Sequence, residues 1–263
     1  MTDNPDRPLA ASGLPEIVRK VRARTPARLF VGRAGAAYRT NTQLELREAH
    51  AAAQDAVHAE LDLQSSFGAE FVERWQLFEV RTNASGKHEY LLRPDLGRRF
   101  DDASRAEIQK CCPPETDLQI AIGDGLSVPA VTAQVPPLLP LLYAGANARG
   151  WKLGRSFVIH RCRVGILNEI GALLNPSVAV LLIGERPGLG TVESLSAYMG
   201  YRPRTTHSDA NRNLVSNIHA RGLSVNEAAT RILDLAGQMM KSNTSGYMLR
   251  QERPAFGQER WKG

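Results

Sequence analysis

Three short apolar segments alternate with helical segments in the second half of the chain, and this alternation is the strongest constraint on its fold. The apolar segments span residues 118–122, 156–161 and 178–183, and the helical stretches 136–149 and 168–174 lie between them. Alternating strands and helices are typical of βαβ units, in which the strands run parallel and the helices cover the sheet. The pattern predicts an α/β fold with a parallel sheet.

The first hundred residues favour helices and one small hairpin. The helical stretches span residues 15–24 and 43–63, and the β-favouring stretches 75–82 and 90–92 flank a turn-like Asn-Ala-Ser-Gly sequence. Apolar residues at helical spacing indicate the helices, and β-favouring residues around a turn indicate the hairpin. The sequence therefore predicts a smaller, mostly helical N-terminal domain over residues 1–100.

Two further helices are expected toward the C-terminus, before a polar tail. The stretch 212–220 is predicted to be helical, and so is 225–241, which follows a Ser-Val-Asn-Glu capping box. The last dozen residues are polar and contain proline and glycine, which is typical of a loose tail. We therefore expect the domain that contains the parallel sheet to span residues 101–250 and the tail to span residues 251–263.

Charge and composition exclude two classes of partner. Lysine and arginine total 33 against 27 acidic residues, so the net charge of +6 is mild, and aromatic residues make up only 6%. Nucleic-acid-binding proteins usually cluster basic residues with aromatic residues between them, which this chain does not. The longest apolar run, residues 178–183, is far shorter than the roughly 20 residues of a membrane-spanning helix. No nucleic-acid or membrane partner is expected.

The N-terminus and the cysteines indicate a cytoplasmic protein. The first residues are polar and lack the basic and apolar regions of a signal peptide. Cys111, Cys112 and Cys162 form no CxxC pair, and their odd number argues against a disulfide framework. A reducing compartment is therefore expected.

Polar residues follow the predicted strands, where ligands collect in an open parallel sheet. Asp124 and Ser127 lie in the glycine-containing loop after the first strand, and Glu185 and Arg186 lie in the loop after the third. Arg163 follows the second strand and suits a phosphate- or amide-bearing ligand. The alternative is that these residues only cap helices or solvate strand ends. Two such loops at one sheet edge favour a binding site.

The sequence lacks the motifs of a self-contained enzyme. It has no HExxH or zinc-type histidine and cysteine spacing, and no GxSxG nucleophile elbow. The loop after the third strand has neither the full GxGxxG spacing nor the Gly-Lys-Ser/Thr end of a Walker A motif. We therefore expect no metal site and no catalytic residue on this chain.

Residues 180–196, VLLIGERPGLGTVESLS, resemble the small subunit of ethanolamine ammonia-lyase. Four other stretches share this resemblance in a consistent order: residues 31–35, 92–99, 124–127 and 216–219. The resemblance extends from about residue 28 to residue 250, and the Gly-Glu-Arg-Pro-Gly-Leu-Gly element is its most specific part. Five separate motifs in one order make a chance match improbable.

The resemblance implies a mostly helical N-terminal part and a Rossmann-like cobalamin-binding domain over residues 101–250. It also implies a cofactor, a partner and a reaction. Enzymes of this family convert ethanolamine to acetaldehyde and ammonia by a radical mechanism that uses adenosylcobalamin, in ethanolamine catabolism. A large TIM-barrel subunit holds the substrate and most catalytic groups, and cobalamin lies between it and the small subunit. A hetero-oligomer in the cytoplasm is therefore expected, with a bacterial microcompartment as an alternative location.

By position, the family's cobalamin contacts fall on Val164, Glu185 and Leu214. The third position is commonly cysteine in the family, so Leu214 removes a thiol but keeps an apolar surface that can pack against a ligand.

Two other functions remain possible from the residues alone. One is a cobalamin-independent α/β enzyme or nucleotide-binding module that uses the Asp124 and Glu185 loops, and the other is a purely structural adaptor.

Overall fold

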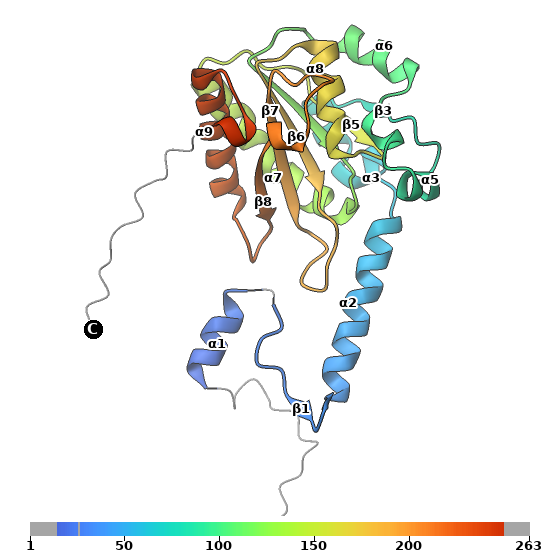
Figure 1. The fold of residues 1–263 in the computed structure, drawn as a ribbon, viewed down its shortest axis with the longest axis vertical. Helices are drawn as coiled ribbons and strands as arrows, with labels where there is room; N and C mark the ends of the chain where they lie inside the picture. Colours follow the sequence, from blue (N-terminus) through green and yellow to red (C-terminus); the bar gives the residue numbers. More distant parts are fainter. Residues whose placement is uncertain (1–14, 26, 250–263) are drawn as a thin grey trace, which may run out of the picture.

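A computed structural model describes residues 15–25 and 27–249, and its centre is a six-stranded mixed sheet (Figure 1). The strand order is β3-β5-β4-β6-β7-β8. The strands are β3 Glu79–Arg81, β4 Leu118–Gly123, β5 Phe157–His160, β6 Val178–Gly184, β7 Leu195–Tyr201 and β8 Asn213–Ile218. The first four in this order pair in parallel, whereas β7 is antiparallel to both β6 and β8. The fold is therefore α/β, but the expectation of a purely parallel sheet is wrong.

Helices cover both faces of this sheet, which explains why its central strands are apolar almost throughout. The long helices α7 Val128–Ala148 and α9 Val225–Ser242 pack on one face, and α6 Asp102–Cys111 and α8 Leu167–Leu174 pack on the other. Every residue of β4 and β6 is buried. Strands covered on both faces form continuous apolar runs without alternation. This is why the three apolar segments predicted these strands.

The N-terminal elements up to the long second helix extend away from the sheet, whereas the short helices that follow it pack against the sheet domain. The N-terminal elements are α1 Glu16–Ala23, β1 Arg33–Ala34, β2 Ala37–Tyr38, α2 Thr40–His58, α3 Leu63–Phe67, α4 Ala69–Arg74 and α5 Lys87–Leu92. The helix α2 projects from the sheet domain toward α1 and the β1–β2 pair (Figure 1). Only two of its residues, Thr42 and Ala56, are buried. Helices were expected in this region, although the second ends at His58 and is followed by the separate helix α3.

Two predicted elements are wrong: the hairpin formed by residues 75–82 and 90–92, and the helix over residues 212–220. The expected hairpin does not form, because β3 pairs in parallel with β5 and the residues after the turn form α5. The stretch 212–220 was expected to be a helix, but it contains β8 at the edge of the sheet. The strand β7 was not predicted, and α7 begins at Val128, before the predicted start. The expected tail, residues 251–263, lies outside the described residues.

Candidate functional site

The two glycine-containing loops lie side by side at the carboxyl ends of β4 and β6. The backbone N–H of Leu126 donates to the carbonyl oxygen of Gly184 over 3.2 Å. Gly125 has a φ of +57°, and neither Gly125 nor Gly184 has room for a Cβ against the opposite loop. Glycine is therefore needed at both positions, because the two backbones touch. The predicted adjacency of these loops is confirmed.

A cavity of about 450 Å³ opens beside these loops and brings together five of the seven residues selected from the sequence. These five are Arg163, Val164, Glu185, Arg186 and Leu214. They come from three separate segments: the β5–α8 connection, the loop after β6, and strand β8. The main residues that sequence reasoning missed are Tyr90, Tyr198, Ser216 and Asn217.

The carboxylate of Glu185 is held by donors from both antiparallel strands. Its Oε1 accepts from the hydroxyl of Ser196 at 2.6 Å and from the backbone N–H of Asn217 at 2.9 Å. Its Oε2 accepts from the hydroxyl of Ser194 at 2.8 Å. Hydrogen bonds to a carboxylate are among the stronger ones in proteins. Glu185 therefore has a fixed position, and it ties the β6 loop to β7 and β8.

Leu214 provides an exposed apolar surface on the wall of this cavity. It lies on β8 directly opposite Tyr198 of β7, and 46% of its surface is exposed. Leu214 therefore lies on an edge strand and not on the helix that was expected over residues 212–220. Val164 and Tyr198 line the same cavity. Together these three side chains give the cavity an apolar patch beside the polar groups of Glu185, Ser216 and Asn217.

Arg163 is held in place by Tyr90, which is fully buried. Its guanidinium lies 4.1 Å from the centre of the tyrosine ring and donates to the Tyr90 carbonyl at 3.1 Å. The Tyr90 hydroxyl lies 2.9 Å from the carbonyl oxygens of both Gly125 and Cys162, to which it donates. Burial raises the pKa of Tyr90, so the hydroxyl keeps its proton. Tyr90 therefore joins the β4 loop to the β5–α8 connection, a role that no sequence signal indicated.

Asp124 and Ser127 lie behind the cavity and do not line it. The Asp124 side chain is only 2% exposed, and its carboxylate accepts from the backbone N–H groups of Arg161 at 2.7 Å and Cys162 at 2.8 Å. Burial raises the pKa of Asp124, although the nearby charge of Lys87 opposes this shift.

Ser127 caps the N-terminus of α7 by accepting from the Ala130 N–H at 3.3 Å, and it donates to the Val192 carbonyl. Both Asp124 and Ser127 therefore make the bonds of structural residues and fix the loops around the cavity.

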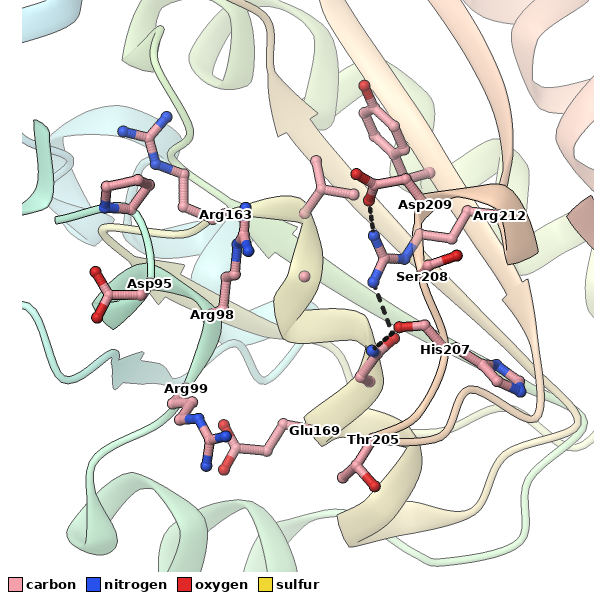
Figure 2. A pocket seen from close by; sticks show the side chains of 15 residues that line it. Asp95, Arg98, Arg99, Arg163, Glu169, Thr205, His207, Ser208, Asp209 and Arg212 are labelled. Carbon is pink, nitrogen blue, oxygen red and sulfur yellow. Dashed lines mark hydrogen bonds and ion pairs between the residues drawn. The ribbon is translucent and has the colours of Figure 1, made fainter.

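A second and larger cavity, of about 870 Å³, adjoins the first (Figure 2). The two share Arg163, Val164 and Tyr198. The arginine-rich stretch 92–99 contributes both an ion pair and part of the wall of the larger cavity. Arg93 and Asp95 form an ion pair at 2.7 Å, whereas Arg98 lines the larger cavity.

Two structural features are absent from residues 15–25 and 27–249. No helix among them is both long and apolar enough to cross a membrane. These residues also contain no group of three or more histidine, cysteine, aspartate or glutamate side chains that could hold a metal ion.

The chain is similar to a known family over almost all of the described residues. A family model for the ethanolamine ammonia-lyase light chain (EutC) matches residues 15–250. Three similar proteins are each named ethanolamine ammonia-lyase small subunit. The protein from Rhodopseudomonas palustris is 41% identical over 235 residues, which are 89% of this chain and 90% of the relative.

The protein from Clostridium acetobutylicum is 39% identical over 235 residues, which are 89% of this chain and 95% of the relative. The protein from Clostridium perfringens is 39% identical over 231 residues, which are 88% of this chain and 76% of the relative. The region matched by the family model includes all six strands of the sheet and both cavities.

Proposed function

Because the chain belongs to the ethanolamine ammonia-lyase light-chain family, we propose that its smaller cavity forms one wall of the cobalamin site in the assembled enzyme. The chain is a subunit of ethanolamine ammonia-lyase, which is a carbon–nitrogen lyase. One observation carries the proposal: Val164, Glu185 and Leu214, which are separated in the sequence, line one cavity. These are the positions at which the family resemblance implies cobalamin contacts.

The chemistry of the cavity fits a corrin. Cobalamin has a large, nearly flat ring with amide side chains around its edge, so it needs an apolar surface and several hydrogen-bonding groups. Leu214 and Val164 supply apolar surface. Ser216, Asn217 and the guanidinium of Arg186 line the same cavity and can bond to amide oxygens. A few polar groups placed in a mainly apolar wall are typical of cofactor sites.

The size of the cavity supports a second protein as partner. A volume of about 450 Å³ lies toward the lower end of the roughly 300–1,000 Å³ that bury a drug-sized ligand. Cobalamin is much larger than such a ligand, so this chain would cover only part of it. The relatives are named small subunits, which implies a large subunit. We propose that the large subunit covers the rest of the cofactor and carries the catalytic residues.

When bound, adenosylcobalamin supplies the radical chemistry that removes ammonia from ethanolamine, and this chain has a supporting part in that reaction. Leu214, Val164 and Tyr198 would exclude water from one side of the cofactor. The three bonds to Glu185 hold β8, and therefore Leu214, in register with the loop after β6. The bonds of Asp124 and Tyr90 fix the segment that carries Arg163 and Val164.

Coexpression with a large subunit tests this proposal. The purified chain, supplied with adenosylcobalamin and ethanolamine, should release no ammonia, and adding the large subunit should give cofactor-dependent release. Cobalamin should be retained by the complex during gel filtration and lost when Leu214 is changed to Asp. Ammonia release by the chain alone, or full activity of the large subunit without this chain, would contradict the proposal.

A further inference from the structure

The larger cavity is the more basic of the two. Arg98, Arg99, Arg163 and Arg212 line it, and they come from three separate parts of the chain. In Figure 2, Arg98 and Arg212 extend toward the same space from opposite sides. Arg163 lines both cavities, so a ligand that extends out of the smaller cavity reaches this basic surface directly.

The acidic residues of this cavity do not neutralise all four arginines. Each of the three acids already has an arginine partner: Asp95 with Arg93, Glu169 with Arg105, and Asp209 with Arg212. Within the described part of the chain, Arg98, Arg99 and Arg163 have no carboxylate at ion-pair distance. Three guanidinium groups therefore remain to attract an anion.

Arg212 is a fixed and buried wall of this cavity. Its side chain is only 7% exposed, and it donates to the side-chain oxygen of Asn168 at 2.9 Å. Burial lowers the pKa of Arg212, and the charge of Arg98 lowers it further, although Asp209 opposes both effects. Asp209 compensates the charge of Arg212, so the positive charge of Arg98 beside it is the one left without a carboxylate partner among the described residues. The arrangement favours an anionic ligand.

The backbone next to Arg98 adds to this preference. The Arg98 side chain packs against Gly165, where an added Cβ would lie 2.8 Å from the arginine Cγ. Gly165 belongs to the short turn η3 Val164–Ile166, which leads directly into α8. Among the described residues, no side chain caps the N-terminus of α8. Val164, Gly165 and Asn168 line the larger cavity, so the N-terminal end of α8, where the helix dipole is positive, borders it.

We propose that this arginine pocket binds a phosphate ester, namely the phosphodiester that links the corrin of cobalamin to its nucleotide tail. The inference rests on the proposed function, because it places a second part of the same cofactor. The phosphodiester is the anionic group of cobalamin, and guanidinium groups bind phosphate oxygens in pairs. With the corrin against Leu214 and Val164, the shared wall at Arg163 leads the tail into the pocket.

Two probes separate the tail from the corrin. Cobinamide has the corrin but lacks the nucleotide tail and its phosphate, whereas cyanocobalamin has both. Both are titrated spectroscopically into the complex of this chain with the large subunit. The variant is Arg98→Gln, because Arg98 is exposed and its change should not impair folding. Arg231→Gln is the matched control, since Arg231 lies exposed on α9 and lines neither cavity.

Arg98→Gln should weaken cyanocobalamin binding by about ten-fold or more and change cobinamide binding by less than about two-fold. Equal weakening of both probes, or of neither, would overturn the phosphate inference while leaving cobalamin binding intact. If the variant lost affinity only for added inorganic phosphate, the pocket would bind free phosphate and the inference would also fail. Failure of the complex with the native chain to bind either probe would instead refute the proposed function.

Discussion

The carboxylate of Glu185, just after β6, accepts a hydrogen bond of 2.9 Å from the backbone N–H of Asn217 on β8, across the intervening strand β7. Asn217 has a φ of +58°, which is unusual for a residue other than glycine. The bond therefore fixes an irregular part of β8 next to the smaller cavity. It makes Glu185 a positioning residue for the wall that carries Leu214.

Glu185→Ala should reduce stability and cobalamin binding together. It leaves three donors without their acceptor, and each unsatisfied donor costs about 1–3 kcal/mol if it stays buried. Glu185→Gln keeps one acceptor oxygen and should restore most of both properties. The measurements are urea unfolding and a cobalamin titration of the complex, with the exposed Glu193→Gln as control. If Glu185→Gln restored stability but not binding, the carboxylate charge would act on the cofactor directly.

Leu214→Asp should abolish cobalamin retention without unfolding the chain. The new carboxylate would lie against an apolar part of the ligand, and its desolvation should weaken binding by at least about ten-fold. Because Leu214 is 46% exposed, Leu214→Ala should change stability by only about 0.5 kcal/mol. Leu214→Cys, which introduces the residue common in the family, should keep the affinity within about ten-fold. A large fall in melting temperature for Leu214→Ala would instead place Leu214 in the core.

Leu141→Asp is the matched control for this series. Leu141 is a partly exposed leucine on α7 and lines neither cavity. This variant should retain cobalamin in the complex as the native chain does.

Asp124→Asn should destabilise the fold by about 1–3 kcal/mol, although only one oxygen is replaced. The two carboxylate oxygens each accept one backbone N–H group, from Arg161 and from Cys162. The amide NH₂ that replaces one oxygen cannot accept a hydrogen bond, so one of these N–H groups loses its acceptor. The loss also loosens the segment before Arg163, so cobalamin affinity should fall in parallel. Thermal melts with Asp55→Asn, an exposed aspartate on α2, provide the comparison. An unchanged melting temperature with lost binding would give Asp124 a role in the site itself.

Lys87 should make stability rise with pH in the alkaline range. Its amino group is buried and has no hydrogen-bond partner among the described residues, and burial lowers its pKa. Between this lowered pKa and the ordinary one, the unfolded chain binds more protons than the folded chain, so raising the pH favours folding. The stability of the native chain relative to Lys87→Met should therefore increase as the pH rises through the alkaline range toward the ordinary pKa of lysine.

The control for this measurement is Lys110→Met, because Lys110 is well exposed on α6. The stability of Lys110→Met relative to the native chain should not change over the same pH range. A pH-independent difference for Lys87→Met as well would show that the pKa of Lys87 is not lowered and that its amino group is charged and solvated in the folded chain.

The sequence predicted the central strands because burial leaves a strong local signal. The residues of β4 and β6 are apolar almost without interruption, since helices cover both faces of the sheet. Glycine and polar residues then follow each strand, and the carboxyl ends of neighbouring parallel strands meet at one edge. The positions of Asp124 and Glu185 at the same edge followed from this rule alone.

The strands at the edge leave a weaker signal. Leu214, Val215 and Ile218 have a spacing that a helix also allows, and β8 pairs with β7 through a register shift between Leu195 and Ala197. Such an irregularity interrupts the alternation by which a half-buried strand is recognised. The short strand β3 was assigned to a hairpin for a related reason, because its partner β5 lies far along the chain.

By itself, the sequence determined the family, the α/β class and the loops that border the smaller cavity, since these depend on local patterns of residues. Only the tertiary structure decided that Glu185 bonds to β8, that Asp124 is buried behind the cavity and that Arg98 and Arg212 border one pocket. The reason is that these relationships depend on strand order and on antiparallel pairing. Both are set by packing among segments that are distant in the sequence, and no local pattern of residues records them.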